Sequence, residues 1–272
     1  MALPTPAGWD CHAHVFGPYE RYPLAAQRSY TPPEATVAQY LALLDRLGLS
    51  HGVLVHPSAY GDDASLLLDV LASHERLRGV MVLRAEQQPA LAGLRDRGVR
   101  AARFSHRSGA AGNFAGSASF DDLLALAPAL ADAGLHAELW TDCRALPELA
   151  PRLRALPVPV VIDHMGGFDA SAGVDEPGFR TLLKLVESGH AWVKLCAYRN
   201  LLGRPDFEAG RVFHEALLAA NPLRLLWGSD WPHLRVEPAP DAAELLATFR
   251  RWTGDEALAT QILVANPAAL YA

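Results

Sequence analysis

Two histidines, His12 and His14, stand one residue apart near the start of the chain. Because side chains alternate between the two faces of a β-strand, both imidazoles are expected on one face of an extended segment. A third histidine, His164, follows an apolar run and precedes two glycines that permit a tight turn. A carboxylate, Asp230, follows another apolar run. Three imidazoles and one carboxylate could activate water and stabilise charge on a carbonyl oxygen, which is the chemistry of a hydrolase.

These four residues are far apart in the sequence, so a regular architecture must bring them together. Short β-rich apolar runs alternate with longer segments of helical periodicity, which predicts βα units around a parallel sheet. Eight strands are predicted, over residues 8–11, 52–55, 79–83, 99–104, 135–140, 158–163, 191–196 and 223–228. Eight strands in a chain of 272 residues favour a single-domain (β/α)8 TIM barrel over residues 1–272, with its site at the C-terminal ends of the strands.

Alternation along two of these strands assigns faces to the candidate residues. On the sixth predicted strand, His164 shares a face with Val160 and Ile162. On the eighth, Asp230 shares a face with Leu226. Since the first and eighth strands are neighbours in a closed barrel, the carboxylate is expected beside the histidine pair. Each residue taken singly has a structural alternative, because a histidine can satisfy a core and an aspartate can cap the next segment.

Helices are predicted between the strands, and the clearest has its first signals at Thr31 and Glu34. Thr31 is expected to cap this helix with Glu34 at the capping-box position, and Gly48 is expected to end it. Further helices are predicted near 62–76, 120–133, 144–155, 178–188, 206–220 and 241–252. Between the third and fourth strands, residues 89–97 leave room for two helical turns.

Composition limits the classes of partner. The net charge is −6 and the basic residues form no stripe, which argues against nucleic-acid binding. No apolar run approaches the roughly 20 residues of a membrane helix, and the N-terminal residues do not resemble a secretory signal. Three scattered cysteines do not suggest a disulfide framework. We therefore expect a soluble, cytoplasmic enzyme with a small-molecule partner, and homo-oligomerisation is left open.

Arginines gather at predicted strand ends although the chain is acidic overall. Because the guanidinium matches carboxylates in a bidentate manner, this pattern indicates a bound organic anion. For any one arginine, a surface salt bridge is an equally good interpretation. The candidate substrate-binding residues, including polar and aromatic neighbours in the same loops, are Arg103, Arg107, Arg199, Ser58, Tyr60 and Trp140, with Arg84 as a further member of the basic group.

Other reactive side chains are interpreted as structural. Asp10, Glu138 and Lys194 share faces with inward residues of their strands, and burying any one of them unpaired would be costly. We therefore predict a buried charge network rather than catalysis by Lys194. Neither Cys11 nor Cys196 has a setting in the sequence that would activate a thiol as a nucleophile.

The motifs together resemble the amidohydrolase superfamily, and within it the amidohydrolase-2 branch that includes 2-pyrone-4,6-dicarboxylate lactonases, sugar lactonases and related decarboxylases. The resemblance implies a hydrolase that opens a carboxylated lactone, with Asp230 activating water. It also implies that the three histidines stabilise the oxyanion and that Arg103, Tyr60 and Arg199 occupy substrate-binding loops. The matching segments are residues 10–14, 162–167, 192–196, 227–233, 266–267 and 270–271.

Many members of the superfamily bind a divalent ion with a lysine on strand four or a histidine on strand five. Here the fourth predicted strand has no lysine, and His136 stands at the beginning of the fifth, so a binuclear centre is not expected. Two alternatives stay open. Either one ion, such as zinc, binds to His12, His14 and Asp230, or no metal is obligatory and the imidazoles donate hydrogen bonds instead. We take the second as the working expectation.

Three other functions are compatible with the same residues. A metal-dependent decarboxylase of an unsaturated or aromatic acid is disfavoured by the missing strand-five histidine. A lactone isomerase would move the ring position without consuming water. A binding module without turnover is disfavoured because all four central residues are retained.

Overall fold

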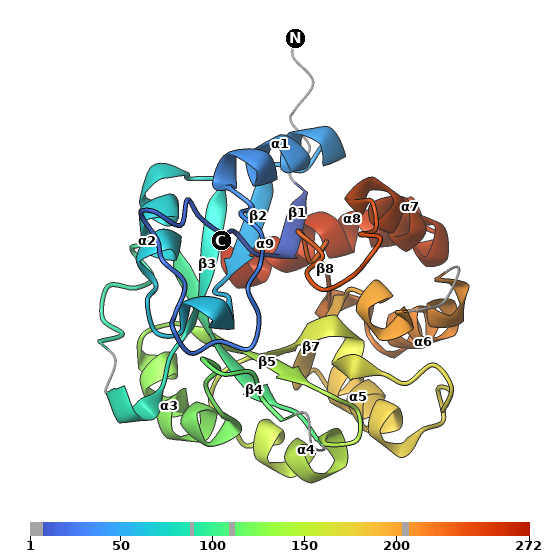
Figure 1. The fold of residues 1–272 in the computed structure, drawn as a ribbon. Helices are drawn as coiled ribbons and strands as arrows, with labels where there is room; N and C mark the ends of the chain where they lie inside the picture. Colours follow the sequence, from blue (N-terminus) through green and yellow to red (C-terminus); the bar gives the residue numbers. More distant parts are fainter. Residues whose placement is uncertain (1–7, 88–89, 109–111, 203–206) are drawn as a thin grey trace.

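A computed structural model describes residues 8–87, 90–108, 112–202 and 207–272 of the chain. Its eight strands form one parallel sheet in the order β1 to β8. Figure 1 shows the strands inside a ring of helices. The strands are β1 Trp9–Ala13, β2 His51–Val55, β3 Leu77–Val82, β4 Val99–His106, β5 His136–Thr141, β6 Val160–Ile162, β7 Ala191–Leu195 and β8 Leu225–Trp227.

The sheet is nearly closed at the C-terminal ends of β8 and β1. The amide of Asp230 donates to the carbonyl of His12 at 2.8 Å, and the amide of His14 donates to the carbonyl of Trp231 at 2.8 Å. Gly228 permits this approach, because a Cβ atom there would lie only 2.7 Å from Cβ of His12. The predicted (β/α)8 TIM barrel is confirmed.

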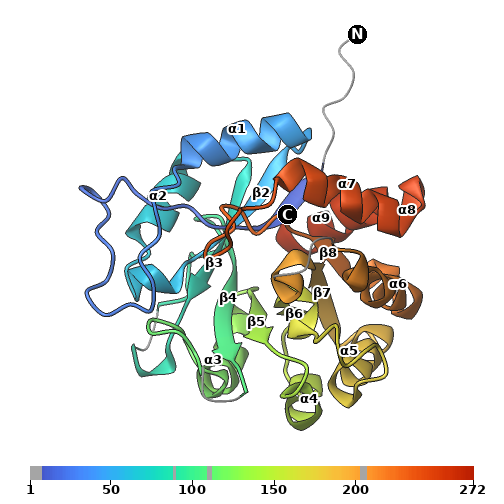
Figure 2. The same cartoon turned by 45° about the vertical axis from the view of Figure 1, so that its right-hand side comes forward.

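The helices cover the outside of the barrel (Figure 2). Each predicted helix except the two turns expected over residues 89–97 has a counterpart, although residue 206, the expected start of one of them, lies outside the described residues. No helix in the described ranges is long and apolar enough to cross a membrane. The helices are α1 Val37–Leu47, α2 Ser65–Ser73, α3 Phe120–Asp132, α4 Leu146–Arg154, α5 Pro177–Glu187, α6 Arg211–Ala220, α7 Ala242–Thr253, α8 Glu256–Thr260 and α9 Asn266–Tyr271.

The predicted start of α1 is wrong by five residues. Thr36 is the N-cap and forms a capping box with Gln39, whose side-chain oxygen accepts from the Thr36 amide at 2.8 Å. Thr31 instead accepts from the Arg28 guanidinium at 2.9 Å, and Glu34 accepts from the amide of Tyr19 at 2.7 Å. Both predicted capping side chains are therefore used to order the long loop after β1.

The helical turns predicted between β3 and β4 are also absent from the described part of that segment. Residue 89 lies outside the described residues, and residues 92–98 form turns rather than an α-helix. Gly93 has a φ of 77°, a left-handed conformation that interrupts an α-helical run.

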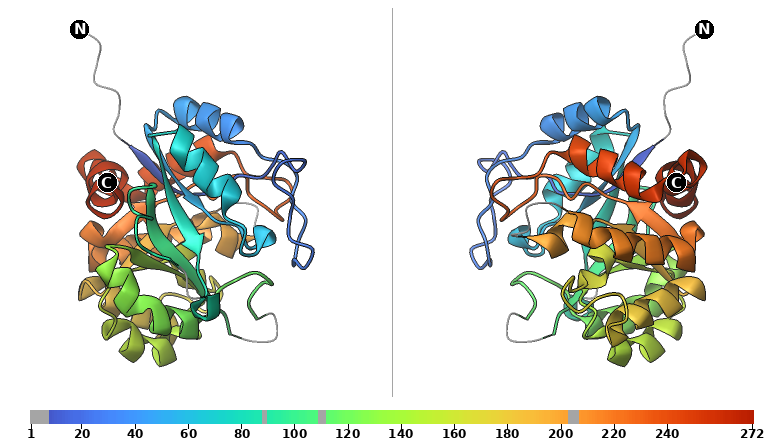
Figure 3. Two further views of the ribbon diagram at one scale, coloured as in Figure 1. Left: turned by 90° about the vertical axis from the view of Figure 1, so that its left-hand side faces the viewer. Right: turned by 90° about the vertical axis from the view of Figure 1, so that its right-hand side faces the viewer.

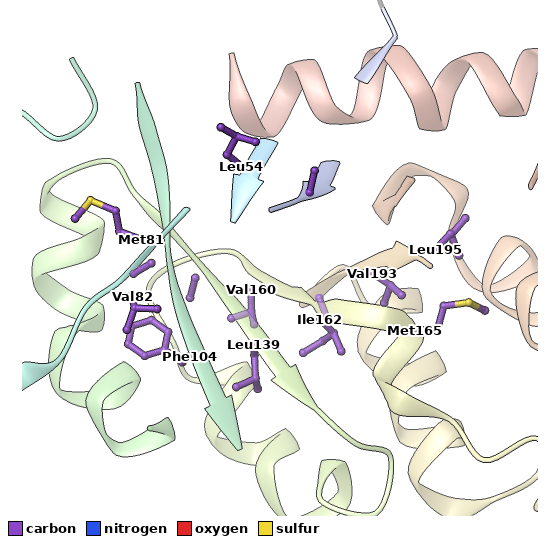
Figure 4. Packing of buried hydrophobic residues seen from close by; sticks show 14 of the residues in the cluster. Leu54, Met81, Val82, Phe104, Leu139, Val160, Ile162, Met165, Val193 and Leu195 are labelled. Atoms are coloured by element: carbon purple, nitrogen blue, oxygen red, sulfur yellow. The ribbon is translucent and has the colours of Figure 1, made fainter. Parts of the chain in front are cut away.

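Buried apolar side chains form two layers. The larger layer lies between the strands and the helices, and Figure 4 shows part of it, including Phe104 on β4 and Leu139 on β5. The smaller layer fills the barrel interior and includes Val53, Val161 and Tyr271. Figure 3 shows α9, which carries Tyr271, at the opposite end of the barrel from the long loop after β1. The barrel interior is therefore filled by apolar side chains near α9, and the opposite end of the barrel carries polar side chains.

Candidate active site

A cavity of about 400 Å³ opens at the C-terminal ends of the strands. Its walls combine charged and aromatic side chains from loops after several strands, as expected for a barrel enzyme. His12 lies beneath the cavity, fully buried. The predicted site residues that line the cavity are His14, His164, Asp230, Arg103, Arg107, Arg199, Ser58 and Trp140.

His12, His14 and Asp230 converge at the floor. Nδ1 of His14 lies 2.7 Å from the carbonyl of Val55, so this nitrogen carries the proton and Nε2 presents a lone pair. That Nε2 atom lies 3.5 Å from Oδ1 of Asp230, and Nε2 of His12 lies 3.7 Å from the same oxygen. Nε2 of His12 has no hydrogen-bond partner among the described residues. The three ligand atoms lie within 4.8 Å of one another, so these residues fit a single divalent ion.

His164 reaches the cavity by a different route from the predicted one. Val160 and Ile162 pack in the outer layer against the helices, whereas Val161 points into the barrel. The shared face predicted for His164 is therefore wrong, because β6 ends at Ile162 and the chain turns. His164 has φ 50° and ψ 45°, and its carbonyl accepts from the Asn200 side chain at 2.8 Å. A left-handed turn, rather than strand alternation, presents this imidazole.

Asp230 is held by two donors on one oxygen. Oδ2 accepts from the Tyr198 hydroxyl at 2.7 Å and from Nε of Arg199 at 2.6 Å. Burial by itself would raise the pKa of Asp230, but Arg199 and the neighbouring imidazoles bring it well below its ordinary value. The carboxylate is therefore ionised at neutral pH. Its φ of 57° is a left-handed conformation that a non-glycine residue seldom adopts, as is common at functional sites.

Two of the imidazoles beside Asp230, those of His12 and His164, are neutral. Burial, reinforced by the ammonium of Lys194, lowers the pKa of His12 to about 4. Burial also holds the pKa of His164 well below its ordinary value. Neutral imidazoles can donate a hydrogen bond or ligate a metal ion. The charge at the floor of the site therefore comes from Asp230 and its arginine partner.

The predicted charge network lies directly below His12. Lys194 donates to Glu138, and its ammonium lies 3.2 Å from Oδ1 of Asp163 and 3.2 Å from Nδ1 of His12. All of these side chains are fully buried. The predicted burial and pairing of Lys194 and Glu138 are confirmed. Asp10 is separate from them, because its carboxylate accepts from the amide of Ser229 at 2.8 Å and from its hydroxyl at 2.6 Å.

Arginines form one wall of the cavity. The Arg107 guanidinium lies 4.6 Å from the ring centroid of Trp140, and its Nε has no hydrogen-bond partner among the described residues. Arg103 contacts Oδ2 of Asp163 at 3.4 Å and is 14% exposed. Arg84 does not line the cavity, because it is paired with Asp62. Of the four arginines predicted for this group, Arg84 is therefore the one that does not line the cavity.

Two predicted substrate-binding residues, Arg199 and Tyr60, have hydrogen-bond partners within the protein. The guanidinium nitrogens of Arg199 contact Asp230 and the Leu234 carbonyl, so this arginine has partners within the protein. Tyr60 does not line the described cavity. Its hydroxyl accepts from the amide of Gly17 at 2.8 Å, which anchors the loop after β1.

Several lining residues were not predicted. Tyr30, Phe114 and Arg235 come from loops whose sequence shows no periodicity and no recognisable motif. The Arg235 guanidinium lies 5.2 Å from the ring centroid of Phe114. The signal available for Arg235 was its place shortly after the eighth strand, which resembles the evidence used for the other arginines.

Several known proteins are similar in sequence to this chain over nearly its whole length. A 4-sulfomuconolactone hydrolase from Rhizobium radiobacter is 37% identical over 100% of this chain and 91% of that protein. A 2-pyrone-4,6-dicarboxylate hydrolase from Comamonas testosteroni is 34% identical over 98% of this chain and 90% of that protein. A D-galactarolactone isomerase from Agrobacterium fabrum is 27% identical over 96% of this chain and 90% of that protein.

A solved structure shows the same architecture. It belongs to a putative 2-pyrone-4,6-dicarboxylic acid hydrolase from Pseudomonas putida, with a TM-score of 0.81 and 32% identity over 98% of this chain and 97% of that chain. The family model described as Amidohydrolase matches residues 9–272. The chain therefore belongs to the amidohydrolase family.

Proposed function

We propose that this protein hydrolyses the ester bond of a lactone that carries anionic groups. The observation that carries the proposal is the convergence of an ionised Asp230 and three imidazoles at the floor of a cavity with arginines in its wall. The two hydrolase relatives are named for lactones that bear sulfonate or carboxylate groups. In an anionic lactone, the ester group would meet Asp230 and the imidazoles at the floor, and the acid groups would meet the arginines of the wall.

Asp230 is the proposed base. Its Oδ2 atom is occupied by Tyr198 and Arg199, so Oδ1 is the atom left to take a proton from water. Loss of that proton activates the water for attack on the lactone carbonyl. Arg199 acts in this scheme by holding the carboxylate rather than by binding the substrate.

The imidazoles of His12 and His164 are proposed to donate hydrogen bonds to the oxygen that gains charge. Donors that are already in place need little reorganisation during the reaction. His14 uses its Nδ1 proton for the Val55 carbonyl, so its Nε2 atom is proposed to ligate a metal ion or to accept a hydrogen bond from water. A divalent ion bound to His12, His14 and Asp230 would supply Lewis-acid stabilisation of the same oxygen.

The wall is proposed to bind the acid groups of the substrate. Arg107 and Arg235 have no ion-pair partner among the described residues, and both guanidinium groups lie over aromatic rings. Arg103 and Ser58 line the same cavity. These donors suit sulfonate or carboxylate oxygens, which accept charge-assisted hydrogen bonds from guanidinium groups.

The test is a rate assay on a panel that contains 2-pyrone-4,6-dicarboxylate, a sulfonated muconolactone, galactarolactone and a neutral lactone. We expect hydrolysis of at least one anionic lactone and a loss of roughly 10²–10⁴-fold in kcat for Asp230→Asn. Asp45→Asn is the control, because this carboxylate is exposed and paired with Arg76. The proposal fails if Asp230→Asn matches the parent, or if no lactone is hydrolysed with or without added zinc.

Isomerisation is the second candidate, and the 27% identical galactarolactone isomerase is the observation that favours it. Hydrolysis of a lactone releases one acid group per turnover, whereas isomerisation releases none. Acid titration at constant pH, combined with identification of the product, separates the two reactions. Release of carbon dioxide would identify a decarboxylase instead.

We also propose a cytoplasmic location. Its support is that Cys11, Cys143 and Cys196 are all free and buried, as expected for a protein from a reducing compartment. Cell fractionation with detection of the protein tests this, and recovery outside the cytoplasm would exclude it.

A further inference from the structure

A series of contacts between buried polar side chains leads from the N-terminal end of the barrel to His12. The hydroxyl of Tyr271 in α9 donates to Oε1 of Glu138 at 2.6 Å. The other carboxylate oxygen, Oε2, accepts from Lys194. The ammonium of Lys194 lies 3.2 Å from Nδ1 of His12. All four side chains are fully buried, and three of them take no part in the proposed chemistry.

Tyr271, the first side chain in this series of contacts, is held by its backbone and by its ring. Its backbone carbonyl accepts from Nε of Arg78 at 3.1 Å and from Nε of Arg100 at 2.9 Å. Its ring stacks on Trp9 with centroids 6.2 Å apart and meets His136 edge-on at 5.1 Å. The backbone contacts and the ring packing hold the phenol where its hydroxyl meets Glu138.

Glu138 needs both of its partners to keep one orientation. Oε1 has the Tyr271 hydroxyl as its close donor, since the His136 imidazole is 3.7 Å away. Without the phenol, the carboxylate would have one strong partner, Lys194, and could rotate to meet it with either oxygen. A buried carboxylate oxygen without a donor is also destabilising, because no hydrogen bond replaces the one it would make with water. The position of the ammonium therefore depends on the phenol.

The ammonium in turn orients the His12 ring. Lys194 lies between Glu138, Asp163 and His12, and Oδ1 of Asp163 is itself 3.3 Å from Nδ1 of His12. If the ammonium moves toward one carboxylate, its contact with Nδ1 changes, and the ring turns toward the contact that remains, Asp163. Nε2, on the far side of the ring, then moves relative to Asp230. Groups that orient a reacting or ligating histidine in this way affect activity without touching the substrate.

We infer that Tyr271 is a positioning residue for the active site and acts on His12 through Glu138 and Lys194. The inference rests on the proposed function, because it assumes that His12 contributes to turnover. It gives α9 a part in the activity in addition to closing the barrel. The cavity for the substrate lies at the opposite end of the barrel, so Tyr271 has no direct access to the bound lactone.

The test begins with Tyr271→Phe, which keeps the ring and removes only the hydroxyl. We expect kcat to fall about tenfold, the lower end of the usual effect of such orienting groups, while KM changes less than twofold. The matched control is Tyr22→Phe, which removes a phenol donor to Asp69 at 2.8 Å in the loop after β1. Both constants should be unchanged in the control.

Glu138→Gln and the double variant with Tyr271→Phe show whether the effect passes through the carboxylate. We expect the double variant to lose no more kcat than Glu138→Gln alone, because both substitutions interrupt the same series of contacts. A crystal structure of Tyr271→Phe should show a longer distance between Lys194 and His12. If Tyr271→Phe does not fold, the kcat and KM of Glu138→Gln decide the question.

Several outcomes would overturn the inference. They are parental kcat in Tyr271→Phe, equal losses in Tyr271→Phe and its control, multiplicative losses in the double variant, or an unmoved His12 contact in the crystal. Asp230→Asn is measured in parallel. If Asp230→Asn is inactive while Tyr271→Phe is normal, only the positioning role is lost. If Asp230→Asn is fully active, the proposed function is wrong first.

Discussion

Replacing Lys194 with methionine tests how much the buried charge network contributes to the free energy of unfolding. Lys194, Glu138 and Asp163 are fully buried, and the ammonium contacts both carboxylates. Removing it leaves Glu138 without its cation and leaves Asp163 with only the 3.4 Å contact to Arg103 as an ion pair among the described residues. Breaking a buried ion pair in this way costs about 3–5 kcal/mol of unfolding free energy.

The corresponding change in melting temperature follows from the size of the chain. Unfolding entropy is about 2.1 cal/mol/K per residue, which for 272 residues is about 0.57 kcal/mol/K. The expected decrease for Lys194→Met is therefore about 5–9 °C at pH 7. Lys184→Met is the matched control, because Lys184 is exposed on α5 and a surface substitution is expected to change stability by no more than about 0.5 kcal/mol.

The difference should depend on pH with a definite sign. Burial alone would raise the pKa of Glu138, but Lys194 lowers it from 4.5 to about 2, so its contribution to stability is complete above pH 4.5 and is lost toward pH 2. In Lys194→Met, burial acts without the ammonium and raises the pKa of Glu138 above that of the unfolded chain. The variant is then penalised at neutral pH, and the penalty disappears as the pH falls below 4.5.

Thermal and urea unfolding at pH 7 and pH 4, followed by circular dichroism, measure both effects. The gap between the parent and Lys194→Met should be widest at pH 7 and narrower at pH 4. A gap at pH 7 no larger than that of Lys184→Met would refute the network as a source of stability. A gap that widens at low pH would refute the assigned ionisation states.

Two further predictions concern the wall and the floor of the cavity. Arg107→Gln should raise KM for an anionic lactone roughly 10–100-fold, the loss expected for one charge-assisted hydrogen bond, with KM for a neutral lactone unchanged; equal effects on both substrates in steady-state assays would contradict this. Gly228→Ala places a methyl group 2.7 Å from Cβ of His12, so it should lower the unfolding free energy by about 1–3 kcal/mol and reduce kcat. A parental melting temperature and rate for this variant would mean that β1 and β8 can separate without consequence.

The sequence by itself was sufficient to predict the architecture and several polar residues at the C-terminal ends of the strands. Hydrophobic periods and their breaks are local properties, so they identified eight strands and most helices before any contact was known. The polar residues that follow those strands then had to meet at one end of the barrel, which brought His14, Asp230 and Arg107 to the same cavity.

Local rules were insufficient where a side-chain pairing or a turn decides the outcome. His164 reaches the cavity through left-handed residues that strand alternation does not describe. Thr31 and Glu34 have the residue types of a capping box, but both side chains bind within the long loop, and the helix starts at Thr36.

The tertiary structure alone decided which charged and polar groups meet. Arg199 was equally suited to a substrate acid group or to Asp230, and the helical turn Tyr198–Leu201 after β7 places it on Asp230. Tyr271 and Glu138 are 133 residues apart, and their hydrogen bond exists because α9 folds under the barrel. Periodicity predicts the face on which a side chain lies, whereas the partner it binds depends on the three-dimensional register of distant elements. For this protein, the sequence therefore predicted many of the residues at the site, and only the tertiary structure showed the contacts that set their ionisation and orientation.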